Sequence, residues 1–234
     1  MKNYIVAATR PWNIASYERN SPQLPGKWTL VQDPLALTIE LVEALQPRYI
    51  FFPHWSWLVG PEIMSRAECV CFHASDVPYG RGGSPVQNLI ERGHDETRLS
   101  ALRMVDALDA GPVYLKERLS LAGRAQDIFE RMAECTWDMI ARIVADEPVP
   151  VAQKGEALVF VRRRPEQSVL PLSGDLGKMY DHIRMLDAET YPAAFLDHGE
   201  FRLEFGDAEA STDAVTACVT IRRMPPPPEQ DEQE

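Results

Sequence analysis

Four short runs of β-branched and aromatic residues alternate with segments that begin like helices, and this alternation limits the fold more than any other feature of the sequence. The runs lie at 4–8, 27–31, 48–53 and 68–73, and each is followed by turn residues or a helix start. Strands that alternate with helices join through right-handed crossovers into a largely parallel sheet. We therefore predict an α/β fold with a mostly parallel sheet, in which ligands bind at the carboxyl ends of the strands.

Two residue pairs mark helix starts between these strands. Asp33-Pro34 precedes LALTIELVEAL and Ser84-Pro85 precedes VQNLIER, and each pair offers an N-cap side chain and a first-turn proline. The first segment also alternates like a strand, but its cap and its leucine spacing favour a helix. Residues 124–145 have the apolar stripe of an amphipathic helix packed on a sheet, formed by Ile128, Met132, Cys135, Met139 and Ile143.

The pattern changes after residue 150. DLGKMYDHIRML is helical, whereas EFRLEF and AVTACVTIRRM alternate like antiparallel strands. We predict three parts: a larger domain at 1–150, a small α+β or β-rich domain at 151–223, and a tail at 224–234. The tail combines four prolines with acids and glutamines, so it is predicted to be disordered.

Composition and charge argue against several classes of protein. The chain is 45% hydrophobic and 25% charged, as in ordinary globular proteins, and it has no run of about 18 apolar residues for a membrane helix. Its first residues lack the apolar core of a secretory signal, and its four cysteines make no disulfide framework, so we expect a cytoplasmic protein. The net charge of -11 argues against a nucleic-acid partner and favours a small-molecule substrate.

His73 and Asp109 are the strongest candidates for chemistry. His73 ends a predicted buried strand, directly before a glycine-rich turn, where an α/β architecture places reactive groups. Asp109 lies in a tight turn between two runs that look like neighbouring strands. The alternatives are a structural histidine and plain turn chemistry, since Asp and Gly are common turn residues.

Other sites are weaker on the residues alone. Cys69, Cys71 and His73 alternate, so a strand would point all three to one face. Structural zinc normally takes four ligands with C-x-x-C spacing, which is absent, so no metal is expected. Ser75 near His73 permits a serine hydrolase, but the GxSxG elbow is missing. The segment RGGSP matches neither the GxxxxGK[ST] phosphate-binding loop nor the GxGxxG motif.

FHASDVPYGRGGSPVQNLI followed by ALDAGPVYL resembles the core motif of the folate-dependent formyltransferases, the family of the methionyl-tRNA, glycinamide ribonucleotide and sugar N-formyltransferases. His73 and Asp109 match the histidine and aspartate of the family, and their separation of 36 residues agrees with the family spacing. FVRRRPEQS and HIRMLDAETYPAAFLDHGEFRLEFGDA resemble the accessory domain of the tRNA and sugar members. The resemblance implies a Rossmann-like formyltransferase core, 10-formyltetrahydrofolate as formyl donor and no metal.

The resemblance also implies a mechanism, with one departure. An amine attacks the formyl carbon, His73 stabilises or protonates the tetrahedral intermediate, and Asp109 orients the imidazole and assists removal of the amine proton. The family has an asparagine two residues before the histidine, and this chain has Cys71, whose thiol is a poor donor. His54 and Asn13 are the candidates to replace that donor. Each has a plain alternative, since His54 would also suit a loop cap and Asn13 a helix start.

The remaining site predictions concern the two substrates. The segment WSWLVGPEI corresponds to the folate-binding stretch, so Trp57, Leu58, Val59 and Asp106 are predicted to hold the folate, although the apolar members would equally suit a core. The residues predicted to meet the acceptor are Asn13, Ser75, Arg81 and Gly82.

The accessory domain and the acidic charge together favour a nucleotide-linked amino sugar, with a 4-amino-deoxy sugar for surface polysaccharide as the first choice. The alternatives are a formyltetrahydrofolate hydrolase, a methionyl-tRNA formyltransferase and a catalytically weak folate or nucleotide-sugar binding module. A homodimer is also considered.

Overall fold

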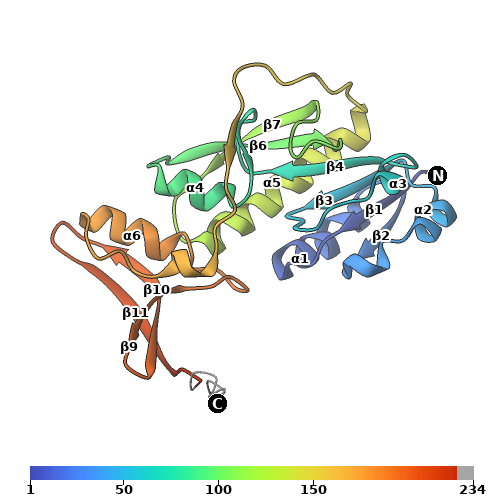
Figure 1. Ribbon diagram of the computed structural model, residues 1–234. Helices are drawn as coiled ribbons and strands as arrows, with labels where there is room; N and C mark the ends of the chain where they lie inside the picture. The colour runs from blue at the N-terminus through green and yellow to red at the C-terminus, as the bar shows by residue number, and fades with distance from the viewer. Residues whose placement is uncertain (226–234) are drawn as a thin grey trace, which may run out of the picture. The chain divides into compact units, whose positions relative to one another are not determined.

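A six-stranded sheet forms the centre of the larger unit in the computed structural model, which describes residues 1–225 (Figure 1). The strand order is β2-β1-β3-β4-β6-β7, and the first four strands are parallel. Strand β6 runs antiparallel to β4, and β7 antiparallel to β6. The predicted α/β fold with a mostly parallel sheet is confirmed. The strands are β1 Asn3–Ala7, β2 Lys27–Val31, β3 Tyr49–Pro53, β4 Glu68–His73, β6 Glu96–Arg103 and β7 Val113–Ser120.

Helices connect the strands and cover both faces of the sheet. They are α1 Pro11–Asn20, α2 Ile39–Leu45, α3 Pro61–Met64, α4 Pro85–Glu91 and α5 Ala125–Asp146. Alternate residues along a strand point to opposite faces, so each face has its own core. On one face, the indole of Trp12 in α1 stacks on Phe129 in α5, with ring centroids 5.3 Å apart. On the other face, Val42 of α2 and Ile63 of α3 belong to a buried cluster with strand residues.

Of the two predicted helix starts, the first is wrong and the second is confirmed without its predicted side-chain cap. The Asp33 side chain accepts from the backbone N–H of Leu35, but it caps only the 3₁₀ turn Pro34–Ala36, and α2 begins at Ile39 after a second cap from Thr38. Ser84 precedes α4 as predicted, yet it has a left-handed backbone with φ of 50° and makes no side-chain cap. The long helix α5 is confirmed. All of its predicted stripe is buried except Cys135, which is partly exposed.

The chain divides into two compact units, Met1–Ala122 with Asp127–Arg162, and Gly123–Gln126 with the residues from Arg163 onward. This division differs from the expected boundary at residue 150. The reason is β8, Leu158–Phe160, which pairs in parallel with β5, Tyr79–Gly82, and so belongs to the first unit.

The second unit contains an antiparallel sheet in the order β11-β10-β9. Its elements are the 3₁₀ turn Pro165–Ser168, helix α6 Leu176–Arg184, and strands β9 Ala194–His198, β10 Phe201–Ala210 and β11 Val215–Arg223. The helix and antiparallel strands predicted after residue 150 are confirmed. The predicted disordered tail falls largely on residues 226–234, which lie outside the described residues. Within residues 1–225, no helix is both long enough and apolar enough to cross a membrane.

Candidate functional site

His73 is the last residue of β4, and both nitrogens of its buried imidazole face polar groups of the protein. Nε2 lies 2.7 Å from the backbone oxygen of Gly80, and because a carbonyl oxygen only accepts, Nε2 is the donor. Nδ1 lies 3.5 Å from Oδ2 of Asp109. With the proton of a neutral imidazole on Nε2, both Nδ1 and the facing carboxylate oxygen are acceptors. A proton placed between these two atoms would be bound by both groups.

Asp109 lies in the turn between β6 and β7, far from His73 in the sequence. The fold joins them because β4 and β6 are neighbours in the sheet, with His73 opposite Ser100. Asp109 has a left-handed backbone with φ of 52°, a conformation that aspartate tolerates better than most residues. Its Oδ2 also accepts from the backbone N–H of Gly82 at 2.9 Å. The two residues predicted to act together are therefore in contact.

A cavity of about 410 Å³ opens beside Asp109, and His73, which contacts Asp109, is not itself among the described residues that line it. Its floor is a row of three neighbouring strand residues, Phe52 of β3, Cys71 of β4 and Leu102 of β6. Its walls are the loops around 55–61 and 104–111, and Asp109 is one of the lining residues. This volume lies within the range of roughly 300 to 1,000 Å³ that is typical of small-molecule sites.

The four residues predicted to hold folate all line this cavity: Trp57, Leu58, Val59 and Asp106. Trp57 is 46% exposed and Leu58 is 93% exposed, so these two side chains are not core residues. Trp57 packs against Trp55, with ring centroids 5.0 Å apart, and Trp55 packs in turn against Phe52. The residues present therefore fit a flat, mostly apolar ligand with polar groups at one end, and their role in binding folate stays a prediction.

Cys71 lies in the cavity floor, at the position where the motif resemblance implies an asparagine. Burial, with a smaller contribution from the negative charge of Asp109, raises the pKa of the Cys71 thiol well above its usual value. The thiol therefore stays protonated at neutral pH. It can offer only a weak S–H donor to a ligand in the cavity.

The two proposed substitutes for the missing asparagine lie elsewhere. Neither His54 nor Asn13 is among the described residues that line the cavity. Asn13 is buried in α1, and its Nδ2 lies 3.4 Å from the backbone oxygen of Pro53. The His54 imidazole packs edge-on against Phe129, with ring centroids 4.6 Å apart. Their contacts are those of core residues, and their proposed role as donors stays a prediction.

The environment of His54 makes stability depend on pH. Burial, assisted by the positive charges of Arg10 and Arg162, lowers the pKa of His54 to about 3. In the unfolded chain this pKa returns to about 6.5, so below about pH 6.5 the unfolded state binds more protons and the free energy of unfolding falls as the pH falls. We expect His54→Asn to flatten this dependence between about pH 6.5 and pH 4, measured as denaturant midpoints. Parallel pH curves for the two proteins would refute this.

The residues predicted to meet the acceptor make internal contacts. The hydroxyl of Ser75, which is 0% exposed, donates to the backbone oxygen of Gly80 at 3.0 Å. The guanidinium of Arg81 donates to Oε1 of Gln153, from Nε at 3.0 Å and from Nη2 at 2.7 Å. Gly82 has φ of 97°, and a Cβ there would lie 2.4 Å from the backbone oxygen of Phe160. Contact of these residues with an acceptor stays a prediction.

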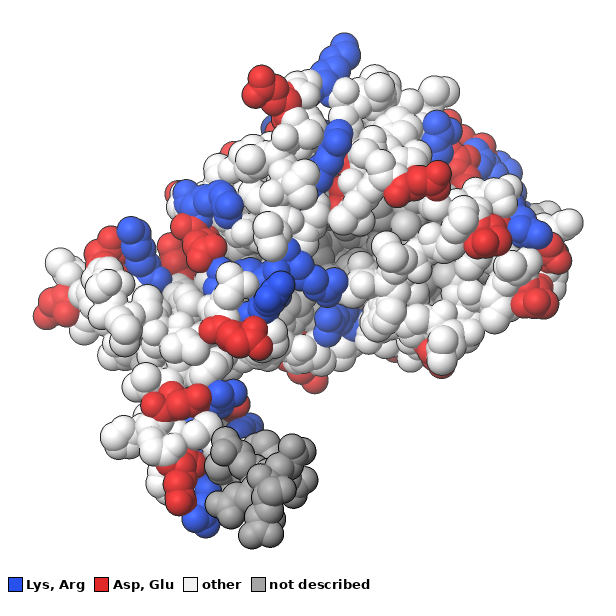
Figure 2. Space-filling view, viewed as in Figure 1, with Lys and Arg blue, Asp and Glu red and all other residues white. Residues whose placement is uncertain are grey.

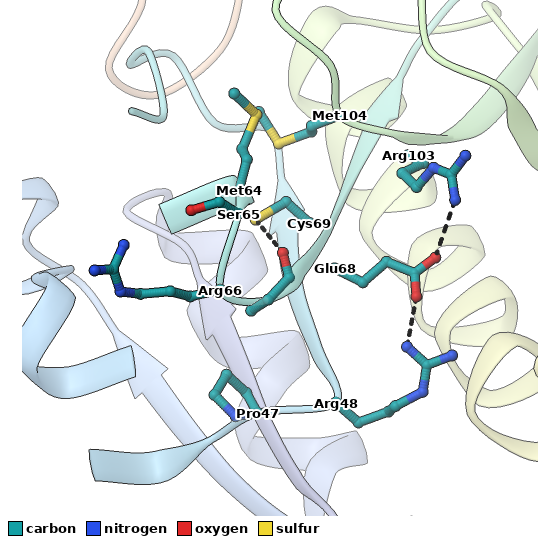
Figure 3. A pocket seen from close by; sticks show the side chains of 10 residues that line it. Pro47, Arg48, Met64, Ser65, Arg66, Glu68, Cys69, Arg103 and Met104 are labelled. Atoms are coloured by element: carbon teal, nitrogen blue, oxygen red, sulfur yellow. Dashed lines mark hydrogen bonds and ion pairs between the residues drawn. The ribbon is translucent and has the colours of Figure 1, made fainter. Parts of the chain in front are cut away.

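A second, more open cavity of about 440 Å³ lies at the beginning of β4 (Figure 3). Figure 3 shows the Glu68 carboxylate between two guanidinium groups, 2.5 Å from Arg48 and 3.9 Å from Arg103. Tyr114 donates a further hydrogen bond to Glu68. These groups bind one another, and neither His73 nor Asp109 lines this cavity, so we assign it a structural role. No group of three or more His, Cys, Asp or Glu side chains that could hold a metal ion is found within residues 1–225.

Gln153 is the site residue that the sequence did not reveal. Its amide contacts Arg81 on one side and the turn containing Asp109 on the other. It lies in a segment without a motif or a periodic pattern, so no signal in a single sequence distinguishes it from its exposed neighbours.

Comparison with known proteins identifies several relatives. Residues 165–222 match the family model described as methionyl-tRNA formyltransferase, C-terminal domain. A solved structure of a methionyl-tRNA formyltransferase from Clostridium thermocellum is 43% identical, with a TM-score of 0.93, and the match covers 95% of this chain and 100% of that chain.

More distant relatives differ in length and in name. The curated methionyl-tRNA formyltransferase of Campylobacter curvus is 28% identical over 172 residues, a match covering 72% of this chain and 56% of that protein. The chain thus spans about half the length of the curated relatives it matches. A 4-N formyltransferase from Francisella tularensis is 11% identical with a TM-score of 0.67, covering 85% of this chain and 93% of that chain, which shows the shared fold alone.

Proposed function

This chain belongs to the formyltransferase family, and on that premise we propose that it moves the formyl group of 10-formyltetrahydrofolate to a primary amine. The observation that carries the proposal is the contact of 3.5 Å between Nδ1 of His73 and Oδ2 of Asp109, at the edge of a cavity that Asp109 lines. Two titratable groups that touch beside a small-molecule cavity are suited to moving a proton during group transfer.

The cavity supports a folate as the formyl donor. Trp57, Leu58 and Val59 offer the flat apolar surface that a pterin ring requires, and the carboxylate of Asp106 offers an acceptor to its ring N–H groups. Since Asp109 lines the same cavity, a folate seated there would present its formyl group to the His73–Asp109 pair.

The reaction needs a neutral amine and a path for one proton. The amine nitrogen forms a bond to the formyl carbon, the bond from that carbon to N10 of the folate breaks, and one proton passes from the amine to N10. Asp109, with His73 behind it, accepts the proton and returns it. The products are the formylated amine and tetrahydrofolate.

For the acceptor we propose methionyl-tRNA. The support is the name of the relatives, including the one that is 43% identical over its whole length. The net charge of -11 was the argument for an amino sugar over nucleic acid. A net charge is a sum over the whole chain and does not describe the charge of any one surface. Figure 2 shows basic as well as acidic side chains in the same view. The charge therefore does not decide against a tRNA.

A nucleotide-linked amino sugar is the second candidate, because solved structures named as sugar N-formyltransferases share the fold of this chain. The two acceptors differ in salt dependence. Binding of a tRNA releases counterions and weakens steeply with salt, whereas binding of a small sugar nucleotide depends on salt much less.

One assay tests the function and separates the acceptors. The purified protein is incubated with 10-formyltetrahydrofolate and with methionyl-tRNA, a panel of nucleotide-linked amino sugars, or no acceptor, and both tetrahydrofolate and formylated product are measured. We expect formylmethionyl-tRNA at the highest rate. A formylated sugar would instead support the second candidate. Tetrahydrofolate without an acceptor would indicate a hydrolase, and no tetrahydrofolate in any mixture would refute the proposed function.

A further inference from the structure

Gln153 is set apart from the chain around it. The neighbouring residues of the segment between α5 and β8 are exposed, whereas Gln153 is partly buried. The segment already has an anchor, because Val151 and Val113 exchange two backbone hydrogen bonds of 2.8 Å. The segment is thus anchored at Val151 independently of the Gln153 amide.

The amide uses its full hydrogen-bonding capacity. Nε2 donates to the backbone oxygen of Asp109 at 2.8 Å and to that of Gly111 at 2.8 Å. Oε1 accepts two hydrogen bonds from the guanidinium of Arg81, at 3.0 and 2.7 Å. A glutamine side chain has two N–H donors and two lone pairs on its oxygen, so none is left over.

These contacts close a ring around the site. Three consecutive residues of β5 take part: Gly80 accepts from His73, Arg81 binds Gln153, and Gly82 donates to Asp109. Gln153 supplies the link from β5 back to the backbone of the Asp109 turn. Strand β5 and the turn are thereby held at one spacing, and the carboxylate of Asp109 is held next to His73.

The turn needs such support. Asp109 has φ of 52°, which costs energy for a residue other than glycine. Gly111 packs so closely that a Cβ there would lie 1.7 Å from the backbone oxygen of Arg103. The two hydrogen bonds from Gln153 hold backbone carbonyls of this turn, at Asp109 and Gly111, while the Asp109 carboxylate itself accepts from Gly82.

We propose that Gln153 is a positioning residue for the formyl transfer, acting through Asp109 and not through the substrates; this inference rests on the proposed function. A misplacement of about 1 Å in a reacting group can cost about 10²-fold in rate. Loss of Gln153 therefore lowers kcat and leaves the KM for the formyl donor nearly unchanged, because the apolar wall of the cavity is untouched.

The test compares Gln153→Leu, Gln153→Glu and the matched control Lys154→Ala, which changes an exposed neighbour. We expect kcat to fall about 10- to 100-fold for the leucine variant. The glutamate variant keeps an acceptor for Arg81 but has no N–H for the two carbonyls, so we expect it to lose at least as much. The control should match the wild type. A glutamate variant with wild-type kcat would overturn the proposal.

A double-mutant cycle with Asp109→Asn tests whether Gln153 acts through Asp109. Gln153→Leu should lower kcat in the wild type but change it less than about twofold in the Asp109→Asn background. Equal losses in both backgrounds, or losses that follow a lowered melting temperature, would overturn the positioning role. If Asp109→Asn itself has wild-type activity, the proposed function fails instead.

A spectroscopic measurement keeps the inference testable without turnover. The ¹⁵N resonance of His73 Nδ1 reports the group that faces this nitrogen. We expect Gln153→Leu to move it in the same direction as Asp109→Asn does, and Lys154→Ala to leave it in place. An unmoved resonance in Gln153→Leu would show that Asp109 keeps its position without Gln153, and the inference would be wrong.

Discussion

Asp109→Asn is expected to lower kcat by about 10²- to 10⁴-fold while the protein stays folded. Asparagine has nearly the same size, and its side-chain oxygen can still accept from the backbone N–H of Gly82, which lies 2.9 Å from Oδ2 in the native protein. It carries no charge and takes no proton, so the contact of 3.5 Å with Nδ1 of His73 loses its function. Initial rates of tetrahydrofolate release at saturating substrates measure the effect.

Two comparisons make this result specific. Asp146→Asn removes an exposed carboxylate at the end of α5 and should leave the rate unchanged. His73→Ala should lower kcat by a similar factor, and the double variant should lose little more than the worse of the two, because groups that act as a unit are not additive. An Asp109→Asn protein within a few-fold of wild type would remove the pair from the mechanism.

Cys71→Asn is expected to raise kcat by about tenfold or more, toward the 10²- to 10³-fold that one oxyanion donor supplies. Cys71 lies in the floor of the cavity between Phe52 and Leu102, and its partly buried, protonated thiol is a weak donor. An asparagine there would point an N–H₂ group into the cavity beside Asp109. The measurement is again kcat with saturating formyl donor.

The control for this variant is Cys71→Ala. Since the thiol donates weakly, the alanine variant should stay within a few-fold of wild type, and thermal melts of both variants check that the cavity floor tolerates the change. A Cys71→Asn protein that is folded but no faster than wild type would show that another group already supplies this donor.

Much of the architecture could be predicted from the sequence because its signals are local. Strands β1, β3 and β4 are short apolar runs whose residues are mostly buried, and α5 is long enough for its apolar period to be clear. The start of α2 could not be predicted, since Asp33 and Thr38 offer two competing caps within six residues and only tertiary packing decides between them. The end of the first unit differs from the expected boundary at residue 150, because β8 is three residues long and pairs with a distant strand.

In the candidate site, too, the features with local sequence motifs could be predicted and those set by tertiary contacts could not. The motifs containing His73 and Asp109 predict that the two side chains act together. Their contact forms because the sheet places β4 beside β6. The partners of Arg81 were not predictable, because its bond to Gln153 joins residues that no local pattern connects. The prediction of an amino sugar over a tRNA depends on the net charge, which is a sum over the whole chain and contains no information about where the charges lie.

The most direct test of the account is a crystal structure of the protein with 5-formyltetrahydrofolate, a stable analogue of the formyl donor. The account predicts the pterin ring against Trp57, Leu58 and Val59, with N10 within hydrogen-bonding reach of Asp109 or His73, about 2.6 to 3.2 Å or through one water. A folate bound in the cavity that contains Arg48 and Glu68, or one whose N10 points away from the His73–Asp109 pair, would contradict it.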